Sequence, residues 1–155
     1  MTATSYGTSS RMAGVGVRVF LTLLGTAGMI VGAFFKWISE IEGTKLDIRA
    51  FWTTTLRSTG TFVQTAGFVM IVLGLVAVIG AAIGSGWLTR LAGAVAIVGL
   101  ILFGIEVYRS AAHESVQPGV WIVLAGAVVT LVGGFFGSQE LITTPPATQV
   151  VVDDD

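Results

Sequence analysis

The chain has 155 residues, of which 54% are apolar and 11% are charged, and its net charge is −1. Soluble domains carry about a quarter charged residues. With a mean hydropathy of +0.88, this composition excludes a disordered protein, a nucleic-acid binder and an ordinary soluble enzyme. The lack of cysteine excludes disulfides and thiolate metal sites, and the single histidine excludes a bis-histidine haem within the chain. We therefore expect an integral membrane protein without a cofactor, a nucleic-acid partner or a small-molecule substrate.

Charged residues divide the sequence into long apolar runs. Because a bilayer core requires about 20 residues of helix, these runs predict transmembrane helices near 15–37, 60–83, 88–109 and 118–137. The expected fold is an all-α membrane protein, with four helices in an up-down bundle over residues 1–137 and a Pro-containing acidic tail over 138–155. The first apolar run is not followed by a small-x-small cleavage site, which favours a retained helix over a signal peptide.

The long connection spans residues 36–57. Residues 45–50 alternate polar and apolar side chains, which is the period of a strand. Ile48 and Trp52 are instead spaced by four residues, as are Trp37 and Ile41, which is the spacing of a helix. Gly43 would interrupt one helix running through both pairs. The sequence predicts a short structured loop on the membrane surface and leaves strand and helix open.

An even number of spans places both termini on the same side of the membrane. Lys and Arg residues near the span ends are more numerous on the side opposite the termini, which favours an outside N-terminus. A short N-terminal segment with Arg11 and Arg18 usually stays inside. We expect a multi-pass plasma-membrane protein with cytoplasmic termini, an orientation that the charge count does not support.

Pairs of glycines four residues apart occur in three of the predicted helices, as Gly28-xxx-Gly32, Gly80-xxx-Gly84 and Gly133-xxx-Gly137. Such pairs let two helices approach closely within lipid. Packing inside the bundle is the simplest role for any one pair. The presence of three pairs in three helices favours at least one that faces another subunit.

The expected partner contact combines the first helix and the long loop. The first predicted helix is a terminal element of the bundle, and it carries a small-residue stripe formed by Gly25, Gly28 and Gly32. Trp37 and Trp52 are added because tryptophans are common interface anchors. These five residues are the predicted partner-binding site.

Few residues could carry chemistry. Glu106 is the acidic residue nearest to a predicted span, where an ionisable group suggests a proton relay. Its spacing of three from Arg109 predicts an ion pair near the headgroups instead. Gln64 is expected to form a hydrogen bond between helices, and His113 to be solvated in a polar loop. No nucleophile–base pair can be assembled, so we do not expect an enzyme.

The run QPGVWIVLAGA at 117–127, continuing to VGGFF at 132–136, resembles the last helix of small actinobacterial tetraspan membrane proteins. Some proteins of this kind are accessory subunits of the mycobacterial respiratory supercomplex of cytochrome bcc and terminal oxidase. The resemblance implies a non-catalytic accessory subunit, in contact with other integral membrane subunits and the lipid bilayer, with a cytochrome c oxidase supercomplex as the leading hypothesis. It assigns no functional residue. The alternative hypothesis is a homo-oligomeric transporter or channel in which Gln64, Glu106 or the threonines of the second predicted helix line a path.

Overall fold

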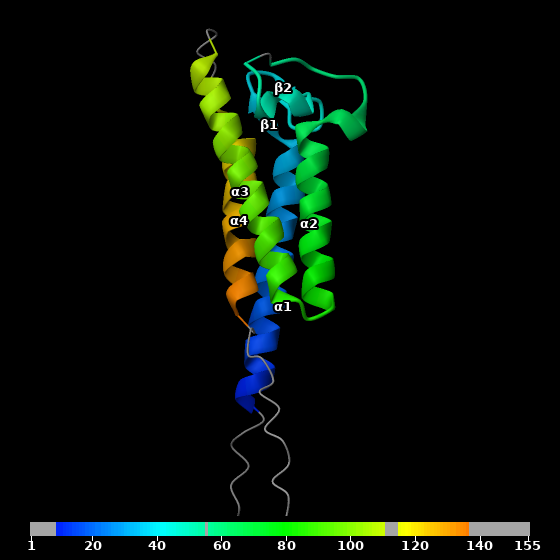
Figure 1. The fold of residues 1–155 in the computed structure, drawn as a ribbon, viewed down its shortest axis with the longest axis vertical. Coiled ribbons are helices and arrows are strands. Elements are labelled where there is room, and N and C mark those ends of the chain that lie inside the picture. Colours follow the sequence, from blue (N-terminus) through cyan, green and yellow to red (C-terminus); the bar gives the residue numbers. More distant parts are fainter. Residues whose placement is uncertain (1–8, 55, 111–114, 137–155) are drawn as a thin grey trace, which may run out of the picture.

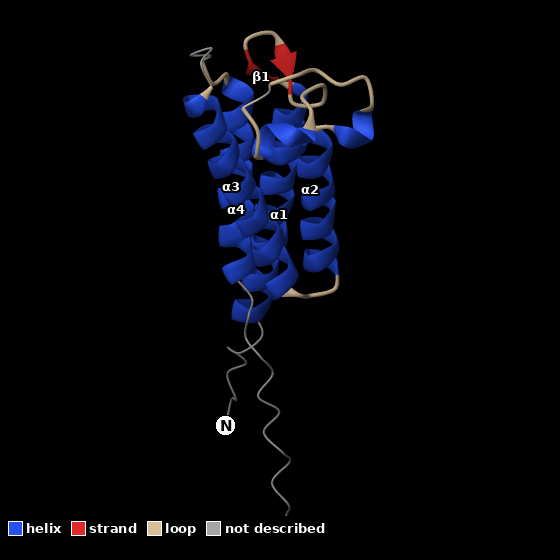
Figure 2. Ribbon diagram, turned by 45° about the horizontal axis from the view of Figure 1, so that its top comes forward, coloured by secondary structure: helices blue, strands red, loops and turns tan. Residues whose placement is uncertain are grey.

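In a computed structural model, which describes residues 9–54, 56–110 and 115–136 with side chains from Gly16 onward, four helices run alternately up and down (Figure 1). They are α1 (Ser9–Phe34), α2 (Ala66–Ala82), α3 (Gly86–Arg109) and α4 (Pro118–Phe135). Helices α1 and α3 each pack against both α2 and α4, so the bundle is square in section. The start of α1 and the end of α4 lie at the same end of the bundle (Figure 2). The predicted all-α up-down bundle is confirmed.

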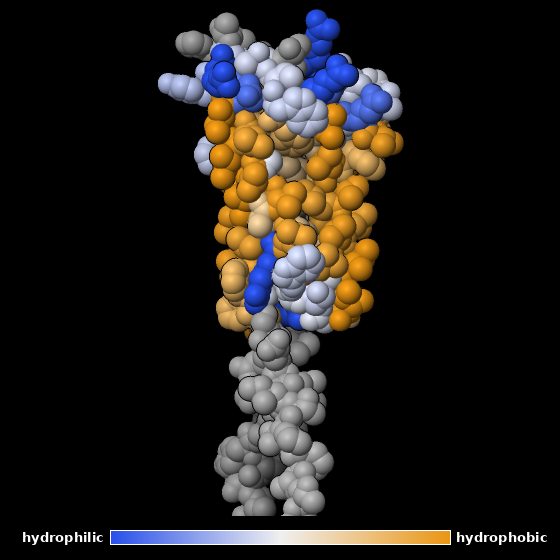
Figure 3. Space-filling view, viewed as in Figure 1, coloured by the Kyte–Doolittle hydropathy of each residue, from blue (hydrophilic) through white to orange (hydrophobic). Residues whose placement is uncertain are grey.

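Three helical segments are long and apolar enough to cross a membrane: Gly16–Phe34, Gly86–Arg109 and Pro118–Phe135. Helix α2 is apolar but has 17 residues, which at 1.5 Å per residue span about 25 Å. On the face shown in Figure 3, hydrophobic side chains cover most of the helices, hydrophilic side chains gather at the end that carries the long loop, and a smaller hydrophilic patch lies near the opposite end. This distribution is that of a membrane-inserted bundle.

Helix α2 begins later than the sequence predicted, at Ala66 rather than near residue 60. The preceding residues form a 3₁₀ turn, η2 (Phe62–Gln64), and Asp47 makes an isolated β-bridge with Thr65. The Thr65 hydroxyl then accepts a hydrogen bond from the Phe68 amide at 3.1 Å, which caps the helix. The N-cap at Thr65 therefore starts α2 at Ala66, although hydropathy alone predicted a start near residue 60.

Residues 36–54 and 56–65 fold over one end of the bundle, and we call this segment the cap (Figure 1). It contains an antiparallel hairpin of β1 (Lys36–Ile38) and β2 (Ile41–Glu42), followed by a 3₁₀ turn, η1 (Ile48–Phe51). The sequence left both strand and helix open for this loop, and the structure contains short pieces of each. The strands lie earlier than residues 45–50, and the helical part is a single 3₁₀ turn.

The cap satisfies backbone groups that the helix ends leave unpaired. The Thr44 amide donates to the Ala33 carbonyl at 3.0 Å, near the end of α1. At the start of α2, the amides of Ala66 and Gly67 each donate at 2.8 Å to carbonyls of the cap. Helix termini expose such groups, so the cap completes two helices at once and is a structural part of the bundle.

The cap and the bundle share one hydrophobic core. Trp37, Leu46 and Phe51 of the cap are buried together with Phe103 of α3. The rings of Trp37 and Phe103 meet edge to face, with centroids 5.3 Å apart. Burial and ring contact together hold the cap in one position on the helices.

Candidate functional site

The predicted small-residue stripe of α1 lies against α4, inside the bundle. A Cβ added to Gly25 would lie 2.6 Å from the Gly126 carbonyl oxygen, and one added to Gly28 would lie 3.2 Å from the Gly126 Cα. A Cβ on Gly32 would lie 2.7 Å from a methyl of Val123. The expectation that these glycines form a groove for another subunit is wrong, because α4 of the same chain already fills it.

Trp37 is also an internal residue and not an external anchor. Its side chain is fully buried, and its Nε1 donates a hydrogen bond to the Gly32 carbonyl at 3.0 Å. Gly43 lies directly against the indole, since a Cβ there would be 2.6 Å from the ring carbon Cε2 of Trp37. The prediction that Trp37 binds a partner is therefore corrected: this tryptophan ties the cap to α1.

Trp52 differs from Trp37, because 59% of its surface is exposed. It ends η1, where its amide donates to the Arg49 carbonyl at 3.0 Å. Other exposed aromatic side chains at the cap end of the bundle include Tyr108 and Trp121. Of the five residues predicted to bind a partner, Trp52 is the one that the fold leaves accessible.

The other glycine pairs also pack within the bundle. Gly80 faces Thr89 of α3, and Gly133 faces Thr22 of α1. Gly84 adopts a positive φ of 75° in the turn between α2 and α3, which favours glycine. Gly137 lies outside the described residues. For Gly80 and Gly133, the hypothesis of an outward docking face is wrong, whereas Gly84 is exposed in the turn and has no neighbour within 4 Å of an added Cβ.

The residues proposed for a proton or ion path lie in different elements, Gln64 in η2 and Glu106 in α3. Glu106 pairs with Arg109 at 3.6 Å near the end of α3, and 14% of the Glu106 side chain is exposed. Gln64 lies exposed in η2, and its side chain forms no hydrogen bond with the described helices, contrary to expectation. His113 lies outside the described residues. The predicted Glu106–Arg109 ion pair is confirmed.

Two arginines at the end of the bundle opposite the cap bind helix carboxyl termini. Arg18 is buried, and its Nη1 and Nη2 donate to the carbonyls of Gly84 and Gly80 at 2.9 and 3.3 Å. Arg90 donates from Nε to the Gly134 carbonyl at 2.9 Å. Cations are favoured at helix C-termini. These bonds could not be predicted from the sequence, because the acceptor carbonyls lie far away in the chain.

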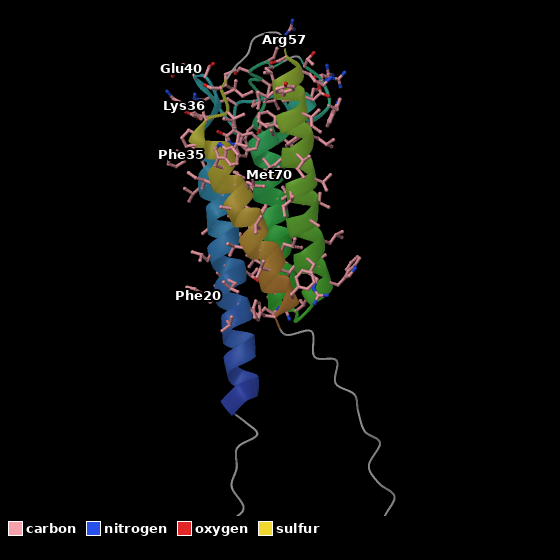
Figure 4. The ribbon with its side chains drawn as sticks, turned by 90° about the vertical axis from the view of Figure 1, so that its left-hand side faces the viewer. Phe20, Phe35, Lys36, Glu40, Arg57 and Met70 are labelled. Atoms are coloured by element: carbon pink, nitrogen blue, oxygen red, sulfur yellow. The ribbon has the colours of Figure 1, made fainter. Side chains whose placement is uncertain are left out.

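An open groove of about 510 Å³ lies where α1 ends and α4 begins, and we call it the hairpin groove. Its lining residues are Phe34, Phe35, Lys36, Glu42, Gln117 and Pro118. Figure 4 shows Phe35 at the end of α1, with Lys36 and Glu40 beyond it on the cap side. The groove combines aromatic walls with charged groups of both signs. This groove could not be predicted from the sequence, because its walls come from segments far apart in the chain.

Within the described residues no group of three or more His, Cys, Asp or Glu side chains could hold a metal ion. Buried threonines supply the polar groups between helices: Thr26 donates to the Gly74 carbonyl and Thr89 to the Ala77 carbonyl, at 3.4 and 3.3 Å. These bonds serve helix packing. No family model, no curated protein and no solved structure matches the chain.

Proposed function

We propose that the chain is a non-catalytic accessory subunit of a larger integral membrane complex. The observation that carries this proposal is the cap, which is rigidly built from buried side chains yet exposes Trp52, Arg49 and Arg57 to the surroundings. A folded surface with an accessible aromatic side chain and positive charge is suited to binding a protein partner.

The charges of the cap are unevenly neutralised. Lys36 pairs with Glu40, and Lys45 pairs with Glu42. Arg49 and Arg57, by contrast, are exposed and form no ion pair with a carboxylate of the described residues. Figure 4 places Arg57 at the outermost cap end of the molecule. These arginines favour a partner with an acidic surface outside the bilayer.

Hydrogen bonds of Asp47 hold the segments that carry Arg49 and Arg57 next to each other. The Asp47 amide donates to the Arg57 carbonyl at 2.9 Å, and the Asp47 carboxylate accepts a hydrogen bond from the Arg49 amide at 2.8 Å. Asp47 thus holds the two arginine segments together, and Trp52 follows directly through η1. This shared anchorage supports a single contact surface, which we call the arginine surface.

The resemblance of residues 117–136 to actinobacterial tetraspan proteins makes a respiratory supercomplex with a terminal oxidase the first complex to test. A homo-oligomeric transporter is less well supported. Among the described residues, the interior of the bundle is closed by glycine–backbone contacts, and Gln64 and Glu106 lie near the cap end.

Affinity purification of the tagged full chain from native membranes in mild detergent tests the proposal. We expect other integral membrane subunits to co-purify, and the charge reversal Arg57→Glu to reduce their recovery several-fold, because rim and core charges contribute to recognition. Lys45→Glu is the matched control: it makes the same change in charge on the same cap, at a residue that already has an acidic neighbour. Equal recovery with both variants would remove the arginine surface from the proposal, and the absence of any co-purifying subunit would remove the proposal itself.

A further inference from the structure

The hairpin groove lies at the level where a bilayer changes from acyl chains to headgroups. Phe34 is the last residue of one apolar span, and Pro118 is the first residue of another. Phe34 and Phe35 are both half exposed at this level, and Trp121 is exposed one turn further along α4. Aromatic side chains are typical of the membrane interface. The groove therefore opens toward the region that glycerol and phosphate groups of lipids occupy.

The polar side of the groove carries both signs of charge. Lys36 and Glu42 are opposite each other in the hairpin, since their Cα atoms are register partners. Each has a partner outside the groove lining, Glu40 for Lys36 and Lys45 for Glu42. These four residues carry no net charge together. A headgroup with a negative and a positive group fits this arrangement better than an anionic headgroup does, because each of its charges meets an opposite charge.

We propose that the hairpin groove binds one phospholipid whose headgroup combines a phosphate with a primary ammonium, as in phosphatidylethanolamine. The Lys36 ammonium binds the phosphate, and the Glu42 carboxylate accepts hydrogen bonds from the lipid ammonium. Phe34 and Phe35 contact the first methylene groups of an acyl chain. The volume of about 510 Å³ lies within the range of pockets that hold small organic groups, roughly 300–1,000 Å³. This site is independent of the proposed subunit role.

The test uses the full chain in detergent and native mass spectrometry with added phosphatidylethanolamine, phosphatidylcholine or phosphatidylglycerol of matched acyl chains. We expect one bound phosphatidylethanolamine and an apparent affinity about tenfold higher than for the other two lipids, since a charge-assisted hydrogen bond contributes this much. Glu42→Gln should abolish the preference over phosphatidylcholine, whose quaternary ammonium has no N–H. Lys36→Gln should weaken the binding of all three lipids. Arg57→Gln, on the same cap but outside the groove lining, should change nothing.

Three results would overturn the assignment. The first is equal binding of the three lipids to the wild-type chain. The second is a phosphatidylethanolamine preference that survives Glu42→Gln in a variant that unfolds at the same temperature as the wild type. The third is displacement of the lipid by millimolar inorganic phosphate, which would show a site for phosphate alone.

Discussion

The indole nitrogen of Trp37 donates a hydrogen bond to the carbonyl oxygen of Gly32, at 3.0 Å. The donor belongs to the cap and the acceptor to the last turn of α1, so this bond joins the loop to the helix that precedes it. Gly32 can approach so closely to α4 only without a side chain. One pair of residues thus fixes both the position of the cap and the contact between α1 and α4.

Trp37→Ala is expected to lower the free energy of unfolding by about 3–5 kcal/mol, because it removes a fully buried aromatic side chain and leaves a cavity. Trp52→Ala should cost less than about 1 kcal/mol, since that side chain is largely exposed. Thermal unfolding in detergent, followed by near-UV circular dichroism, measures both variants. Equal losses of stability would show that Trp37 is not the residue that holds the cap.

Gly28→Leu is expected to disrupt the bundle itself. A Cβ added to Gly28 would already lie 3.2 Å from the Gly126 Cα, and the branched part of leucine would force α1 and α4 apart. Overpacking of this kind costs about 1–3 kcal/mol or more. Gly104→Leu in α3 is the control, because a Cβ at that position meets nothing within 4 Å. Size-exclusion profiles and thermal midpoints distinguish the two. A folded Gly28→Leu bundle with wild-type stability would restore the interpretation of an external docking face.

Arg18→Met is expected to loosen the carboxyl-terminal turn of α2, because the carbonyls of Gly80 and Gly84 lose their donors. Hydrogen bonds to charged groups contribute about 1.5–3 kcal/mol. Hydrogen exchange measured by mass spectrometry should show faster exchange at residues 79–85, with little change in the cap. Arg57→Met provides the comparison, since this exposed arginine contacts no helix end through an observed bond. Unchanged exchange at residues 79–85 in Arg18→Met would contradict the capping role.

Side-chain hydropathy was enough to locate the helices. The predicted ranges 88–109 and 118–137 correspond to Gly86–Arg109 and Pro118–Phe135. The end of α1 was predicted too late, because Trp37 has the hydropathy pattern of a helix yet turns back into a hairpin. Sequence could not determine which way the glycines face, since a stripe of small residues is the same for an internal and an external partner. Nor could it find the target of Arg18, which lies 62 and 66 residues further along the chain.

Glu106→Gln is expected to change the free energy of unfolding by less than about 1 kcal/mol, because the partner Arg109 is largely exposed and such ion pairs contribute little. It should also leave partner recovery unchanged, since Glu106 is not part of the arginine surface. Proteoliposomes that contain the wild-type chain should show no proton flux for this variant to remove. A flux that depends on Glu106 would favour the transporter hypothesis.

If the chain works as one subunit among others, its native particle contains further subunits, so the composition of that particle is the decisive measurement. Membranes extracted into polymer nanodiscs without detergent keep such particles intact, and mass photometry with subunit identification by mass spectrometry measures their make-up. We expect a heteromeric particle that contains this chain at fixed stoichiometry with larger membrane subunits. A particle that contains only this chain, as a monomer or a homo-oligomer, would show that the chain is not an accessory subunit.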